Sequence, residues 1–169
     1  STQTASGSAT ISFTSGIDDT YDSYVFKFYD IHPATDSVHF QVNFRDGGSA
    51  YDATKTTTYF RAFHDEADSA AALGYDTETD LAQSTDFQRL NQTVGNDNDQ
   101  CCVGTLHLYN PSSTTFVKHF ISIENRAQAA NYTVNDYVAG YCNVTAAIDG
   151  VQFKMSSGNI DSGVIKLYG

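Results

Sequence analysis

Apolar and polar residues alternate along several short segments of this chain, and turn-forming residues separate the segments. The clearest alternation runs over Ser37–Phe44, where every second residue is apolar. The apolar phase is Val38, Phe40, Val42 and Phe44, and the polar phase is His39, Gln41 and Asn43. A period of two residues is typical of a β-strand with one buried face. We therefore predict a strand here whose apolar phase enters the core.

Weaker versions of this pattern predict a series of strands along the whole chain. Their expected ranges are Ala9–Thr14, Tyr24–Ile31, Thr56–His64, Asp86–Val94, Cys102–Asn110, Thr114–Glu124, Val134–Ala147, Val151–Met155 and Val164–Tyr168. No long helical pattern lies between them, which argues against a parallel α/β sheet. The spacing of the turns favours an all-β fold, an antiparallel, jelly-roll-like β-sandwich.

One segment departs from strand character. Asp65 and Glu66 precede a run of alanines that stops at Gly74. Acidic residues at the start and a glycine at the end are typical of a short helix, here of about two turns. The expected fold therefore carries one short helical insert.

The length of 169 residues corresponds to one domain with a sizeable core. Residues 1–8 are small and polar, and we expect them to form a flexible arm or linker. Residues 9–169 then form a single β-sandwich domain.

The charge balance excludes some partners. Nine basic and twenty acidic residues give a formal net charge of −11. Nucleic acid binding needs clustered Lys and Arg, so no nucleic acid partner is expected. No apolar run approaches the roughly 20 residues of a membrane helix, so no membrane insertion is expected either.

Three cysteines are too few for a disulfide framework. Cys101 and Cys102 are adjacent and Cys142 is distant. One bridge from Cys142 to either of the others, or free thiols throughout, are both compatible with the sequence. No G-x-S-x-G motif is present, and no pair of carboxylates can be singled out for a glycosidase. We expect a protein that is not an enzyme.

Acidic loops raise the question of a metal ion. The weak calcium candidates are Asp18, Asp19, Asp97 and Asp99. None belongs to a complete calcium-loop motif, so the expectation is no cofactor, with calcium as the alternative.

Tyrosines in polar connections are the better sign of a binding site. Aromatic rings beside amides and carboxylates suit sugar recognition or a protein interface. The candidate ligand-binding residues are Tyr21, Asp22, Tyr51, Asp52, Tyr75, Asn131 and Tyr132. Packing of these rings against the edge of the core is the competing interpretation.

Three blocks of sequence resemble a known class of domain. They are Phe13–Phe44, Thr105–Phe120 and Val151–Gly169, and their most specific parts are G-I-D-x-T-Y-D at Gly16–Asp22, N-P-S-S-T-T-F at Asn110–Phe116 and the closing S-G-x-I-K-L-Y-G. Together they resemble the C-terminal β-sandwich domains of virion structural proteins from tailed, particularly marine, bacteriophages. The resemblance covers most of the chain, and Asp65–Asp86 is its least recognisable part.

This resemblance implies a non-enzymatic domain on the virion surface, in a fibre or tail appendage or as capsid decoration. It also implies a homotrimer that contacts other virion proteins, with host cell-surface glycan as a further possible partner and host attachment as its role. The alternative from the residues themselves is a secreted, lectin-like carbohydrate-binding module that could depend on calcium.

Overall fold

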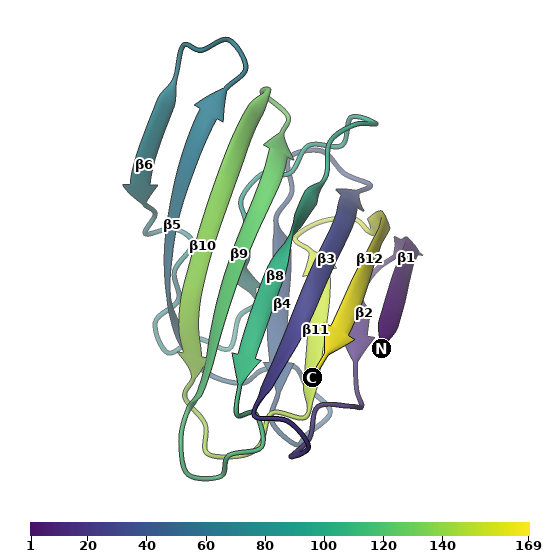
Figure 1. Cartoon of the computed structure of the whole chain (residues 1–169), viewed down its shortest axis with the longest axis vertical. Helices are drawn as coiled ribbons and strands as arrows, with labels where there is room; N and C mark the ends of the chain where they lie inside the picture. Colours follow the sequence, from purple (N-terminus) through teal and green to yellow (C-terminus); the bar gives the residue numbers. More distant parts are fainter.

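The computed structural model describes residues 1–169 as two antiparallel β-sheets packed face to face (Figure 1). Strand bounds are β1 Thr2–Ser8, β2 Ile11–Phe13, β3 Ser23–Pro33, β4 Phe40–Arg45, β5 Lys55–Asp65, β6 Ala71–Tyr75, β7 Gln88–Arg89, β8 Cys102–Tyr109, β9 Lys118–Gln128, β10 Tyr132–Cys142, β11 Gly150–Met155 and β12 Ile160–Tyr168. The all-β sandwich expected from the alternation is confirmed.

The two sheets differ in width. The large sheet has eight strands in the order β1-β12-β3-β8-β9-β10-β5-β6, and the small sheet has four in the order β2-β11-β4-β7. Figure 1 looks onto the outer face of the large sheet, with β2, β4 and β11 behind it. The last two strands of the chain belong to different sheets. β11 pairs within the small sheet, and β12 pairs within the large sheet.

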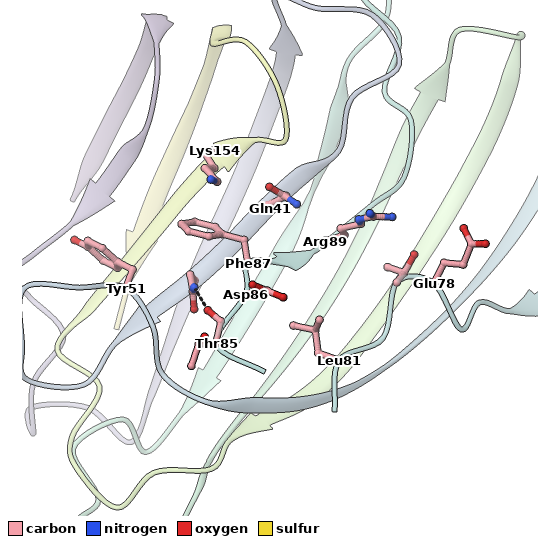
Figure 2. Close-up of a pocket in the computed structure, with 11 residues that line it drawn as sticks. Gln41, Tyr51, Glu78, Leu81, Thr85, Asp86, Phe87, Arg89 and Lys154 are labelled. Carbon is pink, nitrogen blue, oxygen red and sulfur yellow. Dashed lines mark hydrogen bonds between the residues drawn. The ribbon is translucent and has the colours of Figure 1, made fainter. Parts of the chain in front are cut away.

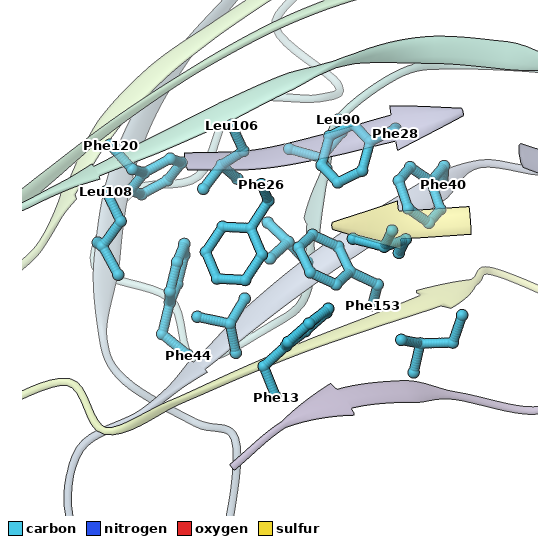
Figure 3. Packing of buried hydrophobic residues seen from close by; sticks show 14 of the residues in the cluster. Phe13, Phe26, Phe28, Phe40, Phe44, Leu90, Leu106, Leu108, Phe120 and Phe153 are labelled. Carbon is cyan, nitrogen blue, oxygen red and sulfur yellow. The ribbon is translucent and has the colours of Figure 1, made fainter. Parts of the chain in front are cut away.

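Phenylalanines fill the space between the sheets (Figure 3). The ring of Phe153 lies at their centre, with its centroid 5.2 Å from that of Phe28 and 5.7 Å from that of Phe40. Phe13 and Phe26 pack edge to face at 5.2 Å. Each such contact adds about 0.5–1.5 kcal/mol to the gain from burying the rings. This aromatic cluster fixes the small sheet over β3, β8 and β12.

Two predictions from the sequence are wrong, because both segments form strands instead. The segment expected as a loose arm forms β1, which pairs with β12 from Thr2↔Lys166 to Ser8↔Ile160. The helical insert expected at Asp65–Gly74 is absent. Instead β5 continues to Asp65, the chain turns, and β6 runs back along β5. Pairing with an existing edge satisfies more backbone groups than two isolated helical turns would.

The small sheet covers only part of the large sheet's inner face. Over β5, β9 and β10 the cover is the segment 76–94, which has little regular structure. Its backbone groups find partners on β5: Leu81 accepts a hydrogen bond from the Thr57 amide, and Lys55 pairs with Ser84 in both directions. The strand expected at Asp86–Val94 is reduced to β7 and a single bridge, Val38↔Val94.

A buried polar network joins this cover to the large sheet. Arg126 of β9 is fully buried and forms an ion pair with Asp136 of β10, Nε to Oδ2 at 2.8 Å. Tyr59 donates a hydrogen bond to the other oxygen of Asp136. Arg126 Nη1 also donates to the Thr93 carbonyl at 2.8 Å. The network therefore attaches the covering segment to β5, β9 and β10 through buried hydrogen bonds.

Glu124 lies beside this network and is also buried. Its Oε2 accepts a hydrogen bond of 2.7 Å from Asn91, and its Oε1 has no partner. Burial raises the pKa of Glu124 well above its ordinary value. The fold therefore favours the protonated form of this carboxyl group.

All three cysteines are free thiols, with Cys102 and Cys142 buried. Burial raises the pKa of Cys142 to about 12, so its thiol is protonated. No helical segment of the structure has the length and apolar character needed to span a bilayer.

Single substitutions in the aromatic core should lower the stability of the protein strongly. Phe40 and Phe153 are 0% exposed, so replacing either with Ala should lower the free energy of unfolding by about 3–5 kcal/mol. Phe116 is 69% exposed, and its replacement with Ala should cost less than about 0.5 kcal/mol. Urea unfolding monitored by fluorescence measures all three. Equal losses at Phe40 and Phe116 would contradict the observed packing.

The buried carboxyl group of Glu124 makes stability depend on pH. Above the ordinary value of 4.5, the unfolded chain releases this proton, whereas the raised pKa makes the folded chain hold it to higher pH. Stability should therefore fall as pH rises above 4.5 towards the folded-state pKa, by at most about 1.4 kcal/mol per pH unit. Glu124→Gln should flatten this slope, whereas Glu66→Gln on the surface should not. Identical slopes for the wild type and Glu124→Gln would refute the assignment.

Candidate functional site

A cleft of about 520 Å³ opens where the segment 76–87 meets the outer face of the small sheet (Figure 2). Polar and charged residues dominate its wall, with a minority of apolar ones. The lining residues are Gln41, Asn43, Tyr51, Glu78, Thr79, Leu81, Thr85, Asp86, Phe87, Arg89 and Lys154.

The floor is a row of side chains across three strands. Lys154 of β11 is registered with Gln41 of β4, and Gln41 with Arg89 of β7. Registered residues on neighbouring strands point to the same face. The outward phase of the alternation therefore places an amide between two cations.

Phe87 and Thr85, on the rim of the cleft, contact residues of β11 and β4. The Nζ atom of Lys154 lies 4.2 Å from the centroid of the Phe87 ring, within the range of a cation–π contact. Asn43 of β4 donates a hydrogen bond of 2.9 Å from Nδ2 to the Thr85 carbonyl. Both contacts join the covering segment to the small sheet beside the cleft.

Tyr51 forms another wall, and Arg45 lies beside it. The guanidinium carbon of Arg45 is 5.9 Å from the centroid of the Tyr51 ring. Arg45 also pairs with Asp149, Nε to Oδ1 at 2.7 Å, and this hydrogen bond raises the pKa of Arg45. The ion pair holds a permanent cation against this aromatic wall.

Lys55 supports the rim from inside the protein. Its side chain is fully buried, and its Nζ donates hydrogen bonds to the Asp86 carbonyl at 2.7 Å and the Ala53 carbonyl at 3.0 Å. Burial lowers the pKa of Lys55 to about 8. Because Asp86 lines the cleft, Lys55 acts as a positioning residue for its rim.

The chemistry of the cleft suits a polar, uncharged ligand. Gln41 can donate and accept hydrogen bonds, the cations donate, and the carboxylates of Glu78 and Asp86 accept. The rings of Tyr51 and Phe87 add apolar surface. Such a mixture matches the hydroxyl groups and C–H faces of a sugar.

The residues predicted from the sequence do not form one site. Tyr51 lines the cleft, while Asp52 is exposed beside it and is not part of the lining. Tyr21 and Asp22 line a separate hollow of about 340 Å³. That hollow also contains Phe116.

The other three candidates lie near the far edge of the large sheet. Tyr75 is on the edge strand β6, where its hydroxyl group donates to Asp80 at 2.5 Å. This hydrogen bond raises the pKa of Tyr75. Asn131 adopts a positive φ of 60° in the turn between β9 and β10, and Tyr132 lines a small hollow with His64.

The calcium candidates are also dispersed. Asp18 accepts hydrogen bonds at one oxygen from the Thr20 amide at 2.9 Å and the Tyr24 hydroxyl group at 2.8 Å, and Asp19 lies in the hollow of Tyr21. Asp99 lines another hollow, while Asp97 accepts a hydrogen bond from the Gln100 amide at its carbonyl. No group of three or more His, Cys, Asp or Glu side chains is placed to hold a metal ion.

Most of the residues that line the cleft were not predicted from the sequence. Gln41, Asn43 and Lys154 stand on the polar phase of two recognised strands, and that phase was the available signal. The sequence does not state that β4 lies beside β11, nor that Phe87 and Arg89 return to the same face.

No family model matches this chain, and no curated protein matches it. Among solved structures, it aligns with a structural-genomics protein of unknown function from Bacteroides ovatus at 5% identity and a TM-score of 0.33. The alignment covers 62% of this chain and 45% of that protein, so the chain spans less than half of its length. This likeness is too low to carry an argument about function.

The support given by Lys55 can be tested by hydrogen–deuterium exchange. In Lys55→Met the Asp86 carbonyl loses its buried donor, and we expect faster exchange in the segment 81–89. Lys118→Met is the matched control, because Lys118 is also buried but donates to the Val144 carbonyl. Unchanged exchange at 81–89 in Lys55→Met would show that the rim does not depend on this contact.

Proposed function

We propose that this chain is a non-enzymatic recognition domain displayed on a phage particle, where its cleft contacts host cell-surface glycans. The cleft over β4, β7 and β11 is the observation that carries the glycan part of the proposal. It combines the Gln41 amide, two aromatic rings, cations and carboxylates within one concavity. Sugar sites use these groups, because hydroxyl groups need partners of both kinds and sugar rings need an apolar surface.

The particle part of the proposal has a different support. It rests on the resemblance of Gly16–Asp22, Asn110–Phe116 and the closing strand to phage virion domains. The net charge of −11 is compatible with display at a particle surface, because it limits nonspecific association. A fibre or tail appendage and capsid decoration remain the two locations within this proposal.

A secreted carbohydrate-binding module is the second candidate. It would use the same cleft, so glycan binding alone does not separate the two. Labelling of virions with an antibody against this chain would favour the particle, whereas the free protein in the culture medium would favour the secreted module. Loss of glycan binding with EDTA would favour the calcium-dependent form of the alternative.

A glycan array followed by titration calorimetry tests the cleft. The double variant Gln41→Ala/Arg89→Ala should weaken binding of the best array ligand at least about tenfold, since two hydrogen-bonding side chains are removed. Tyr21→Ala is the control, because Tyr21 lies in a separate hollow. Melting temperatures of both variants should stay close to that of the wild type.

Two outcomes would contradict the proposal. Binding that is lost in Tyr21→Ala but kept in the double variant would move the site away from the cleft. Cleavage of the bound glycan that disappears in Glu78→Gln or Asp86→Asn would show that the domain is an enzyme.

A further inference from the structure

The outer face of the large sheet collects most of the exposed apolar surface. Except for Tyr21 and Phe116, every large apolar side chain that is exposed points outward from this sheet. Ile121 and Ile123 of β9 are 43% and 45% exposed at its centre. Figure 1 shows no strand of the small sheet on this side. Contiguous apolar surface of this kind marks a contact site.

Its side chains are arranged in registered rows. Phe60 of β5, Tyr137 of β10 and Ile123 of β9 form one row across three neighbouring strands. The rings of Phe60 and Tyr137 stack, with centroids 4.6 Å apart and planes 5° from parallel. Ala139 and Ile121 belong to the next row. The rows combine these apolar side chains with uncharged polar ones, such as Thr105, Asn125 and Asn135, in one ordered surface.

The charge of this face is unlike that of the whole chain. The row through Ile123 and the three rows nearest to it contain no Asp or Glu. Their only charged members are Lys27 and Lys166, at the β3–β12 margin. A chain with twenty acidic residues thus leaves these four rows without a carboxylate.

We propose that this outer face packs against the same face of a second copy of the chain, in place of the homotrimer that the resemblance to virion domains implies. A cationic partner would find no carboxylate in these rows, and an anionic partner would find only two lysines. A near-neutral face of apolar and uncharged polar side chains is the match, and the chain itself carries one. Two copies with a charge of −11 each repel, and contact through this face keeps their carboxylates out of the interface.

The size of the face fits this role. The four rows are about 6.8 Å apart and cross strands about 4.8 Å apart; the row through Ile123 crosses all eight strands and others are shorter, so the face covers roughly 900 Å². A standard protein interface buries about 800 Å² on each partner. Sheets generally stack face to face at about 10 Å.

A contact of this face with itself is isologous and closes as a two-fold pair. If the two-fold axis is parallel to the strands, Lys27 and Lys166 of one copy lie towards Phe60 of the other. Whether the axis is parallel or perpendicular to the strands, the two clefts lie on the outer sides of the pair. The two clefts then face away from each other, and each stays open to its own glycan ligand.

Sedimentation equilibrium at 1–100 µM tests the pair. The wild type should have the mass of two chains, and Ile123→Glu should shift the dissociation constant at least about 100-fold, because it buries one unpaired carboxylate per copy. Phe116→Glu is the matched control, since Phe116 is exposed outside the face. Ile123→Thr, which keeps β-branching, should weaken the pair less than Glu.

Three results would overturn the proposal or its two-fold form. A wild-type monomer at 100 µM, or a pair that survives Ile123→Glu, would overturn the proposal, and a mass of three chains would overturn the two-fold arrangement. Melting curves of dilute Ile123→Glu show whether the monomer is folded. Because glycan binding by the folded monomer is measured separately, failure of the pair and failure of the proposed function are distinguishable.

Discussion

The unequal width of the two sheets is the constraint on which the rest of this structure depends. Four strands cannot cover eight, so the inner face over β5, β9 and β10 needs another cover. The segment 76–94 provides it with little regular structure of its own, and its backbone groups need partners that a sheet would have supplied. Buried polar side chains meet that need. Arg126 donates to the Thr93 carbonyl and Lys55 donates to the Asp86 carbonyl. A side-chain hydrogen bond from Asn91 to Glu124 adds a further link between the segment and the large sheet.

The sandwich consequently has two kinds of interior. Over β3, β8 and β12 it is an aromatic cluster centred on Phe153, where the energy comes from burial and close packing. Over β5, β9 and β10 it is a polar network, where a lost partner leaves a buried charge or carbonyl unsatisfied. The cleft lies where the covering segment of the polar half meets the small sheet. Its shape therefore depends on buried contacts that no ligand touches.

The two outer faces of the sandwich differ in chemistry, and this difference organises the functional proposals. The small-sheet side has a concave, mixed surface with cations and carboxylates around Gln41. The large-sheet side is a broad apolar face without carboxylates at its centre. A domain with one polar concavity and one broad uncharged face is suited to bind a polar ligand on one side and to associate on the other.

The sequence by itself determined the β class, the inward positions of Phe40 and Phe153, and the low helical content, because period-two alternation records burial directly. It also pointed to Tyr51. It did not determine that Thr2–Ser8 would pair with β12, that Asp65–Gly74 would form a hairpin, or that Lys154, Gln41 and Arg89 would share a row. Those outcomes depend on which strands become neighbours, and long-range pairing leaves no local signal in the chain. Only the tertiary structure decided them, because an edge strand, a buried arginine and a cleft floor are each defined by residues distant in sequence.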